Sequence, residues 1–302
     1  MGCILAVRLA EAGHTVSLLD KDAARASRLA RAGITLQGRD RVCTVRLPVC
    51  ADPASVPDCD LFCLCVKAFD TRAALHFWLP VIRRCSSVIS FQNGLGNAEA
   101  CAAAAGAERV FCAVTACGAT RLAEGVVREA GWGPIVLAPW RAEASRDAEH
   151  FAQAVRSAGF EVQLHDNAVE ILWSKLLVNA AINPVTALWD VPNGALIERA
   201  DLHRIAAGTA LEAQAVAAAA GVKLLFADAV QDMERVCRLT ADNVSSMLQD
   251  VRGGRRTEID AITGAVVEEA RRWHVEVPIN EDLLRRVRAL ETSRTHPATR
   301  RA

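Results

Sequence analysis

In the first half of the chain, segments with the hydrophobic pattern of strands alternate with segments that have the pattern of amphipathic helices. Residues 60–66, in which Asp60 precedes a continuous apolar run, are typical of a parallel strand buried on both faces. Shorter strands are predicted at residues 14–20, 33–37, 42–47, 87–91, 110–114, 125–128, 133–137 and 162–165. Helical periodicity predicts helices at residues 2–12, 22–32, 71–84 and 144–157, with an alanine-rich helix after residue 96. This alternation predicts an α/β sheet whose strands are mainly parallel.

The strand pattern stops after about residue 166. Long helices are predicted from there on, separated by glycine or proline, at residues 168–188, 202–220, 227–247 and 258–273. We therefore expect an α/β domain at residues 1–165, an all-helical domain at 166–292, and a frayed tail at 293–302.

Composition and charge restrict the class of partner. The 302 residues are 52% hydrophobic, which excludes disorder, and 35 basic residues balance 35 acidic ones. Without a basic field we expect neither nucleic acid nor an anionic membrane as partner. No uncharged apolar run reaches the length of a bilayer span. A soluble protein with a small-molecule partner is expected, and a homodimer is compatible with the sequence.

Eleven cysteines are present, mostly within apolar runs, and none forms a C-x-x-C pair. In such positions cysteine behaves as a small buried hydrophobe, so we expect reduced structural thiols rather than a redox or metal site. This pattern is typical of a cytoplasmic protein.

The N-terminal helix resembles the one that follows the glycine-rich turn of a dinucleotide-binding βαβ unit. Gly2 occupies the place of the last glycine in G-x-G-x-x-G, whereas the first strand and the first two glycines would precede Met1. We expect translation to start upstream of Met1. The alternative is a truncated, inactive gene product.

Charged and polar residues follow the predicted strands at the edge where ligands bind in open α/β sheets. Asp20 favours NAD through the ribose hydroxyls, whereas the adjacent Lys21 favours the 2′-phosphate of NADP. Lys67 ends the buried run, and Asn93 begins an Asn-Gly pair after the next strand. The alternative is ordinary solvated charges and a plain turn.

A polar stripe crosses the most apolar predicted helix. Lys175, Asn179 and Asn183 recur at i, i+4 and i+8, so one face carries an amine and two amides. Buried amides need partners, and asparagine is a poor helix former on an exposed face. The stripe therefore indicates a binding or catalytic surface, with a solvated face as the alternative.

A second polar cluster lies between residues 245 and 260. Thr257 is a plausible N-cap, and Glu258 in the first helical turn would be stabilised by the helix dipole. Capping alone explains these residues without any function.

Taken in order, four segments resemble the ketopantoate reductase (2-dehydropantoate 2-reductase) family. They are residues 92–96 (QNGLG), 173–187, 245–250 (SSMLQD) and 257–260 (TEID). The resemblance implies a Rossmann-type N-terminal domain, here without its first strand, and a helical C-terminal domain. It also implies NADPH-dependent reduction of 2-dehydropantoate to pantoate in pantothenate synthesis. A reductase of another branched 2-oxo acid and a truncated, non-catalytic binding protein are the alternatives.

The same resemblance assigns roles to residues. Lys175 is the expected general acid, and Glu258 is expected to position Lys175 and the substrate. Asn179 and Asn183 would hold the hydroxyl end of the substrate and Ser246 its carboxylate, while Asn93 would contact both substrate and cofactor. The expected cofactor residues are Gly2, Asp20, Lys21, Lys67 and Asn93. NADPH is the expected cofactor, with NADH kept open by Asp20; no metal is expected.

Overall fold

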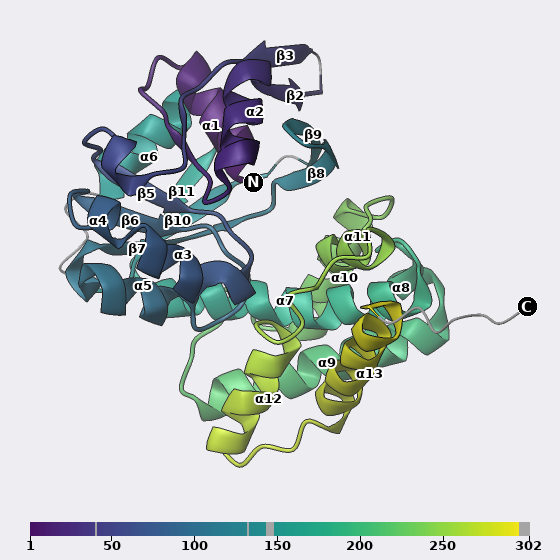
Figure 1. Cartoon of the computed structure of the whole chain (residues 1–302). Helices are drawn as coiled ribbons and strands as arrows, with labels where there is room; N and C mark the ends of the chain where they lie inside the picture. The colour runs from purple at the N-terminus through teal and green to yellow at the C-terminus, as the bar shows by residue number, and fades with distance from the viewer. Residues whose placement is uncertain (40, 132, 143–147, 296–302) are drawn as a thin grey trace, which may run out of the picture. The chain divides into compact units, whose positions relative to one another are not determined.

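The computed structural model describes residues 1–39, 41–131, 133–142 and 148–295. The chain divides into two compact units (Figure 1). The first contains Met1–Gln92 and Asn97–Ala168, and the second contains Asn93–Gly96 and the chain from Val169 onward. The expected division near residue 165 did not anticipate that a four-residue segment from within the first unit belongs to the second.

A five-stranded sheet forms the centre of the first unit, in the order β11-β10-β7-β6-β5. Its strands are β5 (Leu61–Leu64), β6 (Ser87–Ser90), β7 (Val110–Thr115), β10 (Ile135–Pro139) and β11 (Val162–Leu164). The first three are parallel to one another, β10 runs antiparallel to β7, and β11 runs parallel to β10. The α/β class predicted from the sequence is confirmed.

Two smaller sheets complete the strands of this unit. A four-stranded sheet has the order β3-β2-β9-β8, and a two-stranded parallel sheet pairs β1 with β4. Their bounds are β1 (Leu18–Leu19), β2 (Ile34–Gln37), β3 (Val42–Val45), β4 (Val49–Cys50), β8 (Gly118–Ala123) and β9 (Val126–Gly131). We did not predict β4 and β8: β4 has two residues, and no residue of β8 is buried, so no buried-face pattern exists to detect.

Helices cover both faces of the central sheet. They are α1 (Gly2–Glu11), α2 (Ala23–Ala32), α3 (Thr71–Phe77), α4 (Leu79–Ile82), α5 (Asn97–Ala105) and α6 (Ala148–Ser157), with 3-10 turns η1 (Pro53–Ser55), η2 (Ala68–Asp70) and η3 (Ala107–Arg109). Adjacent residues of β6 enter different cores: Ile89 packs with residues of α1 and α6, whereas Val88 packs with residues of α3, α4 and α5. Successive strand residues point to opposite faces of a sheet. The sheet therefore has a helix-covered core on each face, which is the layer arrangement of a doubly wound fold.

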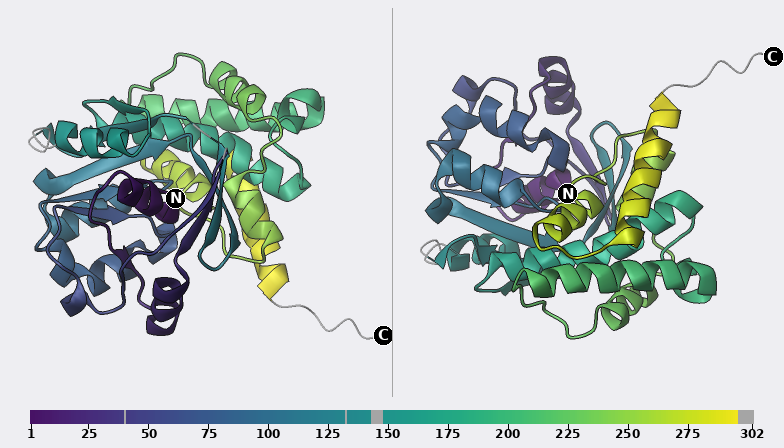
Figure 2. Two further views of the ribbon diagram at one scale, coloured as in Figure 1. Left: turned by 90° about the horizontal axis from the view of Figure 1, so that it is seen from above. Right: turned by 90° about the horizontal axis from the view of Figure 1, so that it is seen from below.

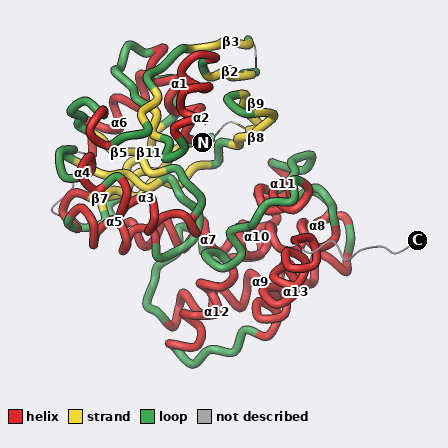
Figure 3. Tube along the Cα trace, in the orientation of Figure 1, coloured by secondary structure: helices red, strands yellow, loops and turns green. Residues whose placement is uncertain are grey.

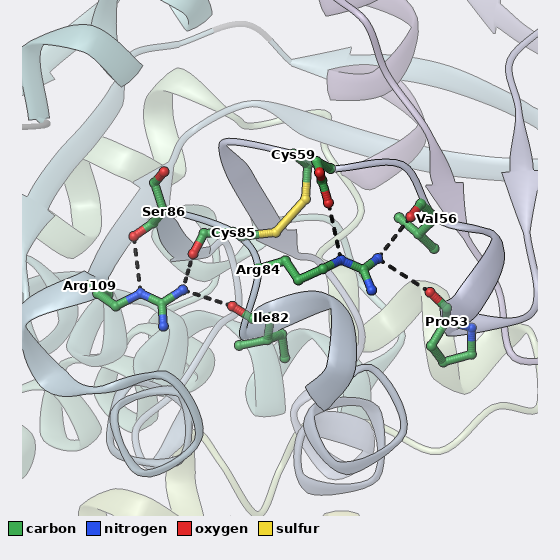
Figure 4. The surroundings of a disulfide bond; sticks show 9 residues. Pro53, Val56, Cys59, Ile82, Arg84, Cys85, Ser86 and Arg109 are labelled. Atoms are coloured by element: carbon green, nitrogen blue, oxygen red, sulfur yellow. Dashed lines mark hydrogen bonds and ion pairs between the residues drawn. A yellow bond between two sulfur atoms is a disulfide. The ribbon is translucent and has the colours of Figure 1, made fainter.

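Cys59 and Cys85 form a disulfide in the first unit (Figure 4). The expectation of reduced thiols is therefore wrong for these two cysteines, while the other nine are free. The cause is strand register. Leu61 of β5 pairs with Ser87 of β6, and each cysteine lies two residues before its strand, so their Cα atoms are 5.2 Å apart.

Two arginines fix the loops around this bridge. The Arg84 guanidinium donates to the Val56 carbonyl at 2.8 Å, and that of Arg109 donates to the Ile82 carbonyl at 2.8 Å (Figure 4). These bonds satisfy carbonyls that the ends of strands and helices leave unpaired.

The second unit is all-helical in its described residues (Figure 3). Its helices are α7 (Ala168–Trp189), α8 (Ala195–Glu198), α9 (Ala200–Ala219), α10 (Ala229–Leu239), α11 (Ser246–Arg252), α12 (Thr263–Arg272) and α13 (Pro278–Thr295). Figure 2 shows α12 and α13 side by side. Among described residues α7 alone is long and apolar enough to cross a membrane, but 83% of its most apolar stretch is buried, as in the core helix of a globular protein.

Three expectations for this unit are wrong. The helix predicted at 227–247 is two helices, because α10 ends at Leu239, where the Thr240 hydroxyl donates to the Val236 carbonyl, and a new cap begins α11. The helix predicted at 258–273 begins only at Thr263. Helix α13 was not predicted, and it continues to Thr295; the rest of the predicted tail lies outside the described residues.

Candidate active site

The polar stripe predicted for residues 175–183 lies on α7. Asn179 and Asn183 are 9% and 5% exposed, and Lys175 is half-buried. Leu176, Leu177 and other apolar residues of the helix pack into the core of the unit, which fixes the direction of the stripe. A solvated face is therefore excluded for the two asparagines.

Glu258 lies in a turn and not in a helix. The Glu258 carbonyl accepts hydrogen bonds from the N–H groups of Ala261 at 3.1 Å and Ile262 at 3.0 Å, and α12 starts only at Thr263. Thr257 is therefore not the N-cap of α12, and Glu258 does not lie in the first turn of that helix, although the Thr257 hydroxyl accepts from the Ile259 N–H at 3.2 Å within the turn. Glu258 is nevertheless only 6% exposed. Since a buried carboxylate is costly, its position requires partners.

Asn93 is one such partner and joins Glu258 to the stripe. Its side-chain Nδ2 donates to Glu258 Oε2 at 3.3 Å, and its Oδ1 accepts from Asn179 Nδ2 at 3.4 Å. All three residues belong to the second unit, although they are separated by up to 165 positions along the chain. The structure thus brings together a carboxylate and two amides that the sequence presented in three separate motifs.

Backbone packing fixes the place of Asn93. The next residue, Gly94, has φ of +86°, and a Cβ there would lie 2.2 Å from the Ala261 carbonyl oxygen. The N–H of Leu95 donates to that same oxygen at 3.1 Å. Only glycine permits this approach, so the Asn-Gly pair docks Asn93 against the turn that carries Glu258.

Ser246 lies at the start of α11, where its side chain is exposed. The preceding Ser245 caps this helix, accepting from the Leu248 N–H at 3.1 Å. The hydroxyl of Thr186, on α7, donates to Ser245 Oγ at 2.7 Å. Both hydrogen bonds of Ser245 Oγ, to Thr186 and to Leu248, are buried. This bond fixes the beginning of α11 against α7.

In the first unit, Gly2 begins α1 in close contact with the end of β5. A Cβ at Gly2 would lie 3.1 Å from the Cys65 Cβ, a contact tight enough to force a shift. Lys67 follows β5 at the N-cap position of η2. The side chain of the buried Gln92 donates to the carbonyl of Val66, the residue before Lys67, at 2.9 Å. A tight glycine at an uncapped helix N-terminus suits an anionic phosphate.

Asp20 and Lys21 directly follow β1, and sequence reasoning missed a third residue beside them. Arg25, in the first turn of α2, donates to both carboxylate oxygens of Asp20. Burial by itself raises the pKa of the Asp20 carboxyl, but hydrogen bonds from Arg25 and the Asp22 N–H outweigh it and hold that pKa below its ordinary value. An arginine five positions after the strand-end acid was the signal in the sequence.

The predicted site residues fall into two sets. Asn93, Lys175, Asn179, Asn183, Ser246 and Glu258 lie in the second unit, whereas Gly2, Asp20, Lys21 and Lys67 lie in the first. Hydrogen bonds join Asn93, Asn179 and Glu258. No group of three or more His, Cys, Asp or Glu side chains within the described residues could hold a metal ion.

Comparison with known proteins follows this division of the chain. The protein-family model "Ketopantoate reductase PanE/ApbA" matches residues 1–142. A second family model, "Ketopantoate reductase PanE/ApbA C terminal", matches residues 167–291. The chain is 36% identical to the 2-dehydropantoate 2-reductase of Halobacterium salinarum over 291 residues, which cover 95% of each protein.

Solved structures agree. A PanE/ApbA family ketopantoate reductase from Ralstonia eutropha JMP134 has a TM-score of 0.86 at 30% identity and covers 98% of this chain and 96% of its own. A D-mandelate dehydrogenase with NADH and anilino(oxo)acetate has a TM-score of 0.91 at 24% identity, covering 98% and 97%, which shows the shared fold.

A Rossmann-like unit joined to a helical unit with a buried amide–carboxylate cluster, together with these matches, defines an NAD(P)H-dependent oxidoreductase that acts on a 2-oxo acid. The match of two family models across almost the whole chain gives the particular family. The chain belongs to the ketopantoate reductase family.

Proposed function

We propose that this protein reduces 2-dehydropantoate to pantoate with NADPH, in the cytoplasm, as a step of pantothenate synthesis. The observation that carries the proposal is the buried cluster in which Asn93 bonds both Asn179 and the Glu258 carboxylate. This cluster lies one helical turn from Lys175 on α7. The names of the curated relatives support the choice of substrate.

The residues of the first unit fit a nicotinamide dinucleotide. The N-terminus of α1, which has no side-chain cap, would receive the pyrophosphate, and Lys21 and Lys67 supply positive charge at strand ends. When bound, the reduced cofactor supplies the hydride that adds to the ketone carbon.

The residues of the second unit hold the substrate and handle the proton. Ser246 binds the carboxylate of the 2-oxo acid, and the amides of Asn179 and Asn183 bind its terminal hydroxyl. The Lys175 ammonium donates a hydrogen bond to the ketone oxygen and then transfers a proton to it, so negative charge on that oxygen is stabilised as it develops. Glu258 orients Lys175 and the substrate.

A panel of substrates tests this function. The purified protein is assayed with NADPH and either 2-dehydropantoate or trimethylpyruvate, which has the same branched skeleton without the terminal hydroxyl. We expect kcat/KM to favour 2-dehydropantoate by about tenfold or more, because buried amides left without their hydroxyl partner penalise the analogue. A preference for trimethylpyruvate would instead indicate a different 2-oxo acid. Calorimetry that detects no binding of NADPH or NADH would favour a non-catalytic binding protein.

Lys175→Ala tests the general acid. We expect kcat to fall by about a thousandfold, because general acid catalysis and charge stabilisation at the ketone oxygen are both lost. The unfolding midpoint should change little, since alanine is the best helix former and Lys175 is only half-buried. Lys223→Ala, which removes an exposed lysine from the same unit, is the matched control and should keep full activity. Near-normal turnover in Lys175→Ala would remove Lys175 from the mechanism.

A further inference from the structure

The end of β1 and the start of α2 hold Asp20 in a fixed position. The backbone N–H of Asp20 donates to the Cys50 carbonyl at 3.0 Å, which extends the pairing of β1 with β4. Asp22 caps α2 by accepting from the Arg25 N–H at 2.9 Å. The cap therefore sets Arg25 in the first helical turn, on the side of the strand end.

Both carboxylate oxygens of Asp20 are engaged there. Arg25 Nε donates to Oδ2 at 2.5 Å and Arg25 Nη2 donates to Oδ1 at 2.6 Å, which is the bidentate arrangement of an arginine–carboxylate pair. The Asp22 N–H donates to Oδ1 at 3.0 Å. The Asp20 side chain is 14% exposed and that of Arg25 is 40% exposed, so the acid lies beneath the guanidinium.

This arrangement changes what a strand-end acid does. In a NAD-binding unit such an acid selects its cofactor by accepting hydrogen bonds from the ribose hydroxyls, and its charge repels a 2′-phosphate. Here the acceptor oxygens already bind a guanidinium, and the negative charge is compensated within the pair. The next residue, Lys21, is exposed and cationic.

We propose that Arg25 masks Asp20 and thereby sets the cofactor preference of this enzyme. Alone, Asp20 would favour NADH; paired with Arg25 it admits the 2′-phosphate of NADPH, to which Lys21 supplies the positive charge. Arg25 is thus a positioning residue that acts through Asp20. The inference rests on the proposed function.

Calorimetric dissociation constants of the full chain for NADPH and for NADH, at one ionic strength, test the masking. Arg25→Ala should raise the Kd of NADPH relative to that of NADH by about tenfold or more, because the carboxylate is uncovered. Adding Asp20→Asn to Arg25→Ala should restore most of the NADPH affinity, and Arg25→Lys should retain it in part. Arg28→Ala is the matched control: Arg28 lies on the same helix, is bound to Glu124 at 2.7 Å, and should leave the ratio unchanged.

The outcomes separate the inference from the proposed function. A loss of NADPH affinity that is equally large in the Asp20→Asn background would mean that Arg25 acts directly and would overturn the masking. An equal change in both dissociation constants would overturn it as well. A wild-type chain that binds neither nucleotide would instead overturn the proposed function. Circular dichroism of each variant checks that the overall helix content is unchanged.

Discussion

Glu258 and Arg25 mark the limits of reading single residues from the sequence. Glu258 was identified by family resemblance, while spacing alone placed it in the first turn of a helix, whereas it lies in a turn that precedes α12. Arg25 was missed, because its importance depends on which way the first turn of α2 faces. Burial and partners depend on tertiary packing, which is why spacing alone was insufficient for both residues.

The charge of Glu258 is testable apart from its shape. Glu258→Gln should lower kcat by about a hundredfold, because the carboxylate that we propose orients Lys175 is lost while an oxygen remains to accept from Asn93. Steady-state kinetics with 2-dehydropantoate and NADPH provide the measurement.

Asp260→Asn is the control for that variant. Asp260 lies two residues further on and is half-exposed, where it pairs with Arg288 at 2.7 Å. Its substitution should leave kcat unchanged. Equal activity in the Glu258→Gln and Asp260→Asn variants would show that Glu258 is only structural.

Individual elements were predictable where one local signal determined them. The apolar run of β5 and the apolar face of α7 were recognised because each repeats a single pattern over its whole length. The expectation that this strand is buried on both faces is wrong, because β5 is the last strand of its sheet and Cys63 is exposed. The break between α10 and α11 was not, because it depends on capping bonds from Thr240 and Ser245 within an otherwise helical pattern. The disulfide depends on the register between β5 and β6, which no local pattern encodes.

Two glycines of the Asn93–Gly96 segment offer a matched pair of substitutions. Gly94 and Gly96 both have φ of +86°, but only at Gly94 would a Cβ meet another atom within 4 Å. Gly96→Ala should cost about 1–2 kcal/mol of unfolding free energy from backbone strain alone. Gly94→Ala should cost more and should also reduce activity, because Asn93 is displaced from Glu258.

Urea unfolding of both glycine variants, followed by circular dichroism, measures this difference. If the two variants lost the same stability and the same activity, the close contact with Ala261 would have no role in placing Asn93.

At the scale of the molecule, the α/β class, the helical second half and the family were all predicted, because each depends on patterns repeated over many residues. Charge is equally global, with 35 basic and 35 acidic side chains. Ion pairs such as Arg235–Asp232 at 2.6 Å intersperse both signs on the surface.

Zero net charge predicts a solubility minimum. We expect the polyethylene glycol concentration that precipitates half of the protein to be lowest near pH 7 and to rise toward about pH 5 and about pH 9, because net charge opposes association. A precipitation midpoint that changed in only one direction across this range would contradict the prediction.

The Asn93–Gly96 segment also constrains how this polypeptide can be divided. A gene fragment that begins at Val169 would encode every helix of the second unit and still lack the amide that bonds Glu258 and Asn179. If the two halves were expressed separately, part of the second unit would therefore remain on the other polypeptide. Any truncation, fusion or circular permutation of this protein has to keep those four residues together with the helices of the second unit.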